Sequence, residues 1–159
     1  MHAPFTAEDH FSRGLKALDA DRHGEALEHF RAAHRLDATR PRYRSYYGLA
    51  VGLAEQRLDR ALELCRSAAK EEFFNAEHYH NLARLHLALG FKAEAIRQLR
   101  RGLMIDPGNA ALGEAVQRMG IRRPPPIRFL RRQHVLNRWA GKLLGRMGTP
   151  GPALSALGT

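Results

Sequence analysis

The sequence holds a single cysteine, Cys65, and this scarcity excludes an internal disulfide and a cysteine-based zinc site. No run approaches the roughly 20 apolar residues that a membrane-spanning helix needs. The first residues, Met1 to Phe5, lack the basic start and the apolar stretch of a signal peptide. From these absences we expect a protein of the reducing cytoplasm.

Sequence motifs for catalysis are also missing. The chain has no phosphate-binding loop, nucleophile elbow or dinucleotide-binding glycine pattern. Its 9 histidines include His78 with His80 and His29 with His34, but steps of two and five residues do not give the four-residue spacing of a helical metal site. We therefore interpret the histidines as surface residues and Cys65 as a buried structural thiol. No enzyme activity, cofactor, metal or small-molecule substrate is expected.

Acidic residues are absent from one region, residues 121–159, which holds 8 of the 26 basic residues and none of the 16 acidic ones. Residues 1–120 therefore carry a net charge of only +2, although the whole chain carries +10. The basic character thus belongs to the C-terminal segment, and the body of the protein is nearly neutral.

An internal repeat is what the sequence does contain. Each of three segments is expected to hold two helices. The first helix contributes one small residue, and the second contributes two small residues with a larger residue between them. The sets are Gly14, Ala26, Phe30 and Ala33; Gly48, Ala61, Cys65 and Ala68; and Ala83, Ala95, Leu99 and Gly102. The alanines Ala26, Ala61 and Ala95 follow one another at steps of 35 and 34 residues. Steps of four and three within each set place its last three residues on one helix face.

Small residues at these positions have a steric reason. Two antiparallel helices approach closely only where small side chains lie at the crossing, as we expect for Gly14 with Ala26 and for Ala83 with Ala95. A hairpin this short cannot bury its apolar face alone and must stack on a neighbour. The sequence predicts hairpins over 7–40, 41–75 and 76–109, and a further helix over 110–119 that covers the stack.

Local signals agree with these boundaries. Thr6 and Asn75 are suitable N-caps, and Pro41 suits the first turn of a helix. Gly24 and Gly90 are expected in the turns inside the first and third hairpins, and Gly120 is expected to end the helix over 110–119.

The threefold array resembles the tetratricopeptide repeat family, whose unit is about 34 residues long. Ile105-Asp106-Pro107 is similar to the end of a family unit, whereas the second unit departs from the pattern because Gly48 and Ala61 are 13 residues apart instead of 12. We place the extra residue in the turn around Glu55-Gln56-Arg57. The resemblance implies an all-α protein, a right-handed α-solenoid of three helix-turn-helix repeats with a capping helix, over residues 7–120.

The C-terminal segment is expected to form separate elements. Residues 121–147 read as a proline-rich hinge followed by a basic amphipathic helix, in which Leu136, Trp139, Leu143, Leu144 and Met147 recur at helical steps. Residues 148–159 read as a disordered tail. The basic residues that we expect to matter here are Arg128, Arg131, Arg132, Arg138, Lys142 and Arg146.

The resemblance also implies a function. In this family the first helix of each unit lines a groove that holds a peptide segment or a helix of another protein. By repeat position, that surface would present Phe11, Leu15, Arg42, Tyr46, Leu49, His80, Asn81 and Arg84. Phe11 and Leu15 stand where the family members that hold a chaperone's terminal carboxylate have polar residues, which argues against that role. The sequence thus favours a protein-interaction scaffold or adaptor.

Three interpretations of the basic segment, residues 121–159, remain possible from the sequence. Its apolar stripe could pack on the repeats and extend the solenoid. It could contact an acidic partner protein or an anionic membrane surface. It could also bind nucleic acid, since basic residues and the aromatics Phe129 and Trp139 are present, although no nucleic-acid reading motif is.

Overall fold

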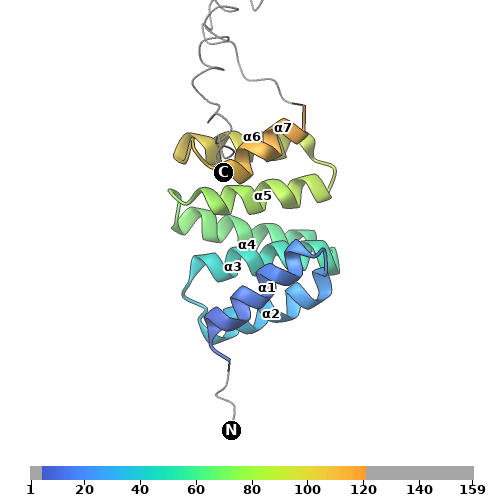
Figure 1. The fold of residues 1–159 in the computed structure, drawn as a ribbon, viewed down its shortest axis with the longest axis vertical. Helices are drawn as coiled ribbons and strands as arrows, with labels where there is room; N and C mark the ends of the chain where they lie inside the picture. Colours follow the sequence, from blue (N-terminus) through green and yellow to red (C-terminus); the bar gives the residue numbers. More distant parts are fainter. Residues whose placement is uncertain (1–4, 121–159) are drawn as a thin grey trace, which may run out of the picture. The chain divides into compact units, whose positions relative to one another are not determined.

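The structure, a computed structural model, describes residues 5–120. This part of the chain consists of helices joined by short turns (Figure 1). The α-helices are α1 (Ala7–Asp19), α2 (His23–Leu36), α3 (Pro41–Ala50), α4 (Leu58–Glu71), α5 (Ala76–Ala88), α6 (Lys92–Ile105) and α7 (Ala110–Arg118), and a π-helical turn, η1 (Val51–Glu55), follows α3. No helix within these residues is long and apolar enough to cross a membrane.

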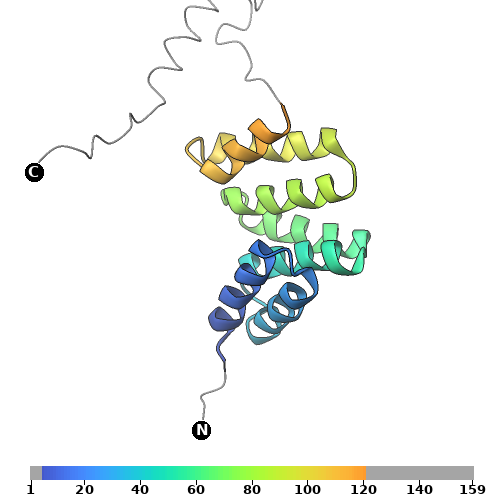
Figure 2. The ribbon, with the colours of Figure 1, turned by 45° about the vertical axis from the view of Figure 1, so that its right-hand side comes forward.

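The helices form three hairpins that stack in chain order. Helix α1 packs on α2, α3 on α4, and α5 on α6, while the second helix of each hairpin packs on the first helix of the next. Figure 2 shows the layers following one another from α1 and α2 to α7. The all-α solenoid predicted from the sequence is thus confirmed for the described residues, including the helix that covers the third hairpin.

The helices begin where the local signals place them. The Thr6 hydroxyl accepts a hydrogen bond from the Asp9 amide at 3.2 Å, and the Asp9 carboxylate accepts one from the Thr6 amide at 2.9 Å. Asn75 caps α5 by accepting from the Glu77 amide at 3.1 Å, and Pro41 is the first residue of α3. The Thr6 and Asn75 side chains satisfy amides that have no partner inside the first turn of a helix, and Pro41 has no amide hydrogen that would need one.

The turn inside the first hairpin differs from the prediction. Gly24 is the second residue of α2 and lies in open space, so it is not a turn residue. Asp21 adopts the left-handed conformation there, with φ of 55°, where the third hairpin uses Gly90 with φ of 78°. Aspartate tolerates this conformation better than most side chains, so the turn needs no glycine. Gly120 ends α7 with φ of 66°, as expected.

The twelve residues that define the repeat are all buried. A Cβ atom on Gly48 would lie 2.8 Å from Leu64 Cβ and from Cys65 Sγ, which explains why glycine occupies this crossing of α3 and α4. A Cβ atom on Gly14 would lie 2.6 Å from the Phe30 ring, so that ring, and not Ala26, is what Gly14 makes room for. At Gly14 and Gly48, the period seen in the sequence therefore reports the contact between the two helices of one hairpin.

The extra residue of the second unit is not in the turn, which corrects the prediction. The residue with positive φ in the turn comes seven residues after Gly14 as Asp21 and seven after Ala83 as Gly90, but eight after Gly48 as Gln56. From that residue to the following alanine the three units are equal in length. The insertion therefore lies in the helix, where η1 takes it up as a π-helical turn.

Two seams join the hairpins, and they differ in composition. We call the first the aromatic seam: the rings of Phe11, Phe30, Tyr43 and Tyr46 meet there with centroids 5.0–5.5 Å apart. We call the second the close seam: it joins the second and third hairpins through Ser45, Gly52, Asn81 and Leu85, all buried. In it, the Asn81 amide donates to the Ser45 hydroxyl at 3.1 Å.

Helix α7 completes the core of the third hairpin. Leu112 is fully buried with Leu99, and Val116 and Met119 pack against the same cluster. A Cβ atom on Gly102 would lie 2.8 Å from Leu112 Cδ1, so the small residue of α6 leaves room for α7. The proline-rich hinge, the basic amphipathic helix with its six basic residues, and the tail expected over 121–159 lie outside the described residues.

Candidate peptide groove

A cavity of about 640 Å³ opens on the face formed by the first helices of the hairpins. We call it the groove. Its walls come from α1, α3, α5, α7, the turn before α5 and the end of α6. The lining residues are Leu15, Leu18, Asp19, Tyr46, Phe74, Asn75, Ala76, Glu77, His80, Arg84, Ile105, Asp106, Asn109 and Ala111. All three repeats and the capping helix thus contribute to one depression.

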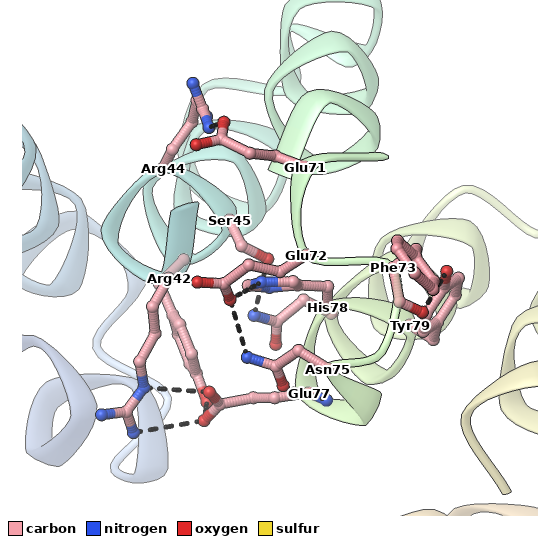
Figure 3. A network of polar contacts seen from close by, with 12 residues as sticks. Arg42, Arg44, Ser45, Glu71, Glu72, Phe73, Asn75, Glu77, His78 and Tyr79 are labelled. Atoms are coloured by element: carbon pink, nitrogen blue, oxygen red, sulfur yellow. Dashed lines mark hydrogen bonds and ion pairs between the residues drawn. The ribbon is translucent and has the colours of Figure 1, made fainter. Parts of the chain in front are cut away.

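Glu77 is the fixed polar centre of the groove. Its carboxylate accepts from Arg42 Nε at 2.9 Å, from Arg42 Nη2 at 3.3 Å and from the Tyr46 hydroxyl at 2.7 Å. Figure 3 shows Arg42 of α3 and Glu77 of α5 facing one another. Burial and the neighbouring Glu77 carboxylate raise the pKa of Tyr46. Burial disfavours the charge on Arg42, but the bonds to Glu77 outweigh it and raise the pKa of Arg42. The three groups hold α3 against α5.

Arg84 is the cation that the groove leaves free. It makes no ion pair or side-chain hydrogen bond with the described residues, and it is half-buried on α5 one turn after His80. Burial, and then the charge of Arg84, lower the pKa of His80, so the imidazole is neutral at pH 7. An arginine that is partly buried and unpaired is suited to bind a carboxylate of another molecule.

The residues expected in the groove separate into two groups. Leu15, Tyr46, His80 and Arg84 line it, and Arg42 lies beside it through its bond to Glu77.

Phe11, Leu49 and Asn81 are not among the lining residues: they are 1%, 0% and 1% exposed, Phe11 in the aromatic seam, Asn81 in the close seam and Leu49 in the core. These three assignments are corrected: a residue of a first helix faces the groove only where the next hairpin does not cover it. Tyr43, the neighbour of Arg42 on α3, is likewise only 2% exposed, and its hydroxyl donates to Glu8 at 2.6 Å.

Several groove residues were not expected from the sequence. Asp19 lies at the end of α1, Phe74 in the turn before α5, and Ile105, Asp106 and Asn109 around the turn between α6 and α7. Repeat position points only to first-helix residues, and the unit end Ile105-Asp106-Pro107 is the one signal in the sequence that marks the last of these turns. Since α7 continues the row of first helices, that turn faces the groove.

The histidines were expected at the surface, but this is wrong for His86, which is 5% exposed, and most clearly for His78. Its side chain is fully buried, with Nε2 2.8 Å from a Glu72 carboxylate oxygen that also accepts from Asn75 Nδ2 at 3.0 Å. Figure 3 shows this cluster between the ion pair of Arg42 with Glu77 and that of Arg44 with Glu71. Glu72 is therefore the hydrogen-bond partner of a fully buried imidazole.

Metal and thiol chemistry find no support in the part of the chain that the structure describes. Over these residues no three histidine, cysteine, aspartate or glutamate side chains gather as a metal site would require. Cys65 is fully buried, and burial raises its pKa to about 12. Its thiol donates to the Ser45 carbonyl oxygen at 3.3 Å. The interpretation of Cys65 as a buried structural thiol is thus confirmed.

Comparison with solved structures identifies the fold as that of tetratricopeptide repeat proteins. The Arabidopsis OM64 TPR domain matches with a TM-score of 0.55 at 20% identity, over 71% of this chain and 93% of that domain. The first TPR of Spaghetti (RPAP3), solved bound to the HSP90 peptide SRMEEVD, matches with a TM-score of 0.56 at 17% identity, over 72% of this chain and 93% of that one.

A third match is YrrB, described as a TPR protein with an unusual peptide-binding site, with a TM-score of 0.56 at 16% identity. The match covers 72% of this chain but 59% of YrrB. No protein-family model matches the sequence, and the search of curated proteins found no match. The shared property is the repeat fold.

Proposed function

We propose that this protein is a scaffold or adaptor that binds a segment of another protein, an extended peptide or a helix, in the groove. The observation that carries the proposal is that one depression of about 640 Å³ takes its walls from every repeat and from α7. A chain segment laid across the stack would contact all of these elements at once. Two proteins of the same fold are described as binding peptides, which supports the same use of the face here.

The lining indicates the chemistry of the bound segment. Leu15, Phe74 and Ile105 offer apolar area, and Arg84 offers an unpaired cation for an acidic side chain. The wall from α1 consists of Leu15, Leu18 and Asp19, so it holds no cation for a terminal carboxylate. This disfavours capture of a chaperone's C-terminus. We therefore expect an internal segment with apolar side chains and an acidic residue facing Arg84.

The test compares two charge reversals of equal size in the full-length protein. Arg84→Glu places a carboxylate in the groove, and Arg100→Glu does the same on an exposed position of α6 that does not line it. We expect recovery of the partner in quantitative affinity capture to fall about tenfold with Arg84→Glu and to change less than about twofold with Arg100→Glu. Circular dichroism should show equal helicity.

A photo-crosslinking amino acid in place of His80 should then form an adduct with a defined segment of that partner. Equal recovery with both charge reversals would contradict a role for the groove, as would an adduct that never forms. Tyr46→Ala, which removes a nearly buried ring of the aromatic seam, would confound binding with stability and is not suited to this test.

Binding of nucleic acid or of a membrane through the basic segment of residues 121–159 stays a prediction from the sequence. The first requires retardation that weakens steeply with salt, and the second requires co-sedimentation with anionic but not neutral vesicles. Both effects would have to disappear when this segment is deleted.

A further inference from the structure

A second cavity, of about 430 Å³, lies between α4 and α6. We call it the basic cleft. It is lined by Arg66, Ala69, Lys70, Phe73, Tyr79, Leu82, Gln98 and Arg101, and it shares no residue with the groove. Figure 3 shows Tyr79 on the side of α5 away from Glu77, which lines the groove. The two cavities therefore face in different directions.

All the charged side chains that line the basic cleft are positively charged. Its lining holds three cations, Arg66, Lys70 and Arg101, and no carboxylate. All three are exposed, and none forms an ion pair or a side-chain hydrogen bond within residues 5–120, whereas Arg42, Arg44 and Arg97 of the same two hairpins are each paired with a glutamate. Three like charges that converge without a counter-charge favour an anionic ligand.

The floor of the cleft is apolar and fixed. Ala69, Leu82 and Tyr79 are at most 7% exposed, and the Tyr79 hydroxyl donates to the Phe73 carbonyl oxygen at 3.0 Å. The guanidinium carbon of Arg101 lies 5.2 Å from the centre of the Tyr79 ring. A guanidinium held over a ring keeps its N–H edge available for a carboxylate. Beside it, the Phe73 ring is 66% exposed and offers apolar area at the rim.

We propose that the basic cleft binds an acidic peptide segment of a second partner, with an apolar side chain against Phe73 and Leu82 and carboxylates on Arg66, Lys70 and Arg101. The chain's own residues 121–159 do not fit this description, since they hold 8 basic residues and no acidic one. A nucleic-acid strand fits poorly, because stacking of successive bases needs several exposed rings and the cleft offers only Phe73.

The experiment measures binding of a short fluorescent peptide, in which phenylalanine is flanked by glutamates, to the full-length protein. Arg101→Glu reverses a charge in the cleft, and Arg100→Glu makes the same change one residue away outside it. We expect Arg101→Glu to weaken binding about tenfold and Arg100→Glu by less than about twofold. Replacing the phenylalanine of the probe by serine should also weaken binding to the wild-type protein.

Further arms distinguish the alternatives. Equal weakening by Arg100→Glu would show that the probe binds through general positive charge, and would overturn the proposal. Greater weakening by Arg84→Glu than by Arg101→Glu would place the probe in the groove and would also overturn it. Tighter, Arg101-dependent binding of a labelled oligothymidine would identify nucleic acid as the ligand instead. Arg66→Glu serves as a second cleft variant if Arg101→Glu reduces the helicity.

Discussion

The aromatic seam and the close seam use equivalent repeat positions with different side chains. Phe11 and Ser45 each stand three residues before the small residue of their first helix, and Tyr46 and Asn81 each stand two residues before it. In the aromatic seam Phe11 meets Tyr46 as two rings, with centroids 5.1 Å apart and nearly perpendicular. In the close seam the same pair of positions is a hydrogen bond of 3.1 Å from Asn81 to Ser45.

The difference shows how one repeat geometry accommodates two kinds of interface. Four rings fill the aromatic seam, so its stability depends on apolar area and ring packing. The close seam has small groups, and a Cβ atom on its Gly52 would lie 2.2 Å from Leu85 Cδ1. Its stability depends on a close approach and on satisfied polar atoms. The seams should therefore respond differently to equivalent substitutions.

The largest effect is expected from Phe11→Ala in the aromatic seam. The ring contacts Phe30, Tyr43 and Tyr46, and its loss leaves a cavity that the neighbouring rings can fill only in part. We expect the free energy of unfolding to fall by about 3–5 kcal/mol in urea denaturation. Phe73→Ala removes a ring that is 66% exposed and should cost less than about 0.5 kcal/mol. Similar losses for the two variants would contradict the burial that defines this seam.

Gly52→Ala tests the close approach of the second and third hairpins. The added methyl group collides with Leu85, which is fully buried and has little room to move, and it lies 3.2 Å from Ala61 Cβ. We expect a loss of about 1–3 kcal/mol by the same measurement.

Gly24→Ala is the matched control, because this glycine is inside α2 with nothing within 4 Å of its Cβ position. It should raise stability by about 0.5–1 kcal/mol. The comparison of the seams fails if both alanines stabilise the protein.

Ser45→Ala tests the polar contact that replaces the ring pair. It leaves the Asn81 amide nitrogen buried without an acceptor, while Asn81 Oδ1 already lacks a partner in the described residues. We expect a loss of about 1–2 kcal/mol.

Combining it with Asn81→Leu removes both polar partners and should recover most of that loss, because no buried donor remains. A double-mutant cycle measures this coupling. Additive losses would show that the two side chains do not depend on one another.

Much of the fold could be read from residues whose role is local. Thr6, Asn75 and Pro41 mark helix starts because their side chains act within one turn. The triplets such as Ala26, Phe30 and Ala33 mark the hairpins because the contact they make recurs in every unit. The position of the extra residue could not be read, because a gap of 13 residues fits a longer turn and a π-helical turn equally well.

The candidate site could be read only in part. Leu15, Tyr46, His80 and Arg84 were expected from repeat position, and they line the groove. Phe11 and Asn81 occupy first-helix positions too, but they are covered by the neighbouring hairpin. The pairing of charges could not be predicted from the sequence either: Glu77 binds Arg42, 35 residues away, while Arg84 has no ion-pair partner within residues 5–120. Which charged residues pair depends on how far one hairpin is shifted along the next, and no local sequence pattern indicates that shift.

By itself, the sequence determined that this protein is a stack of helical hairpins, since small and large residues at a constant period allow the two helices of each hairpin to meet in only one way. The tertiary structure decided which faces remain open. Burial of a first-helix side chain depends on how closely the next hairpin approaches. In the aromatic seam the approach is limited by the rings, and in the close seam it is limited by the small groups of Gly52, Ser45 and Asn81. The groove and the basic cleft are two surfaces that the stacking of the hairpins leaves open.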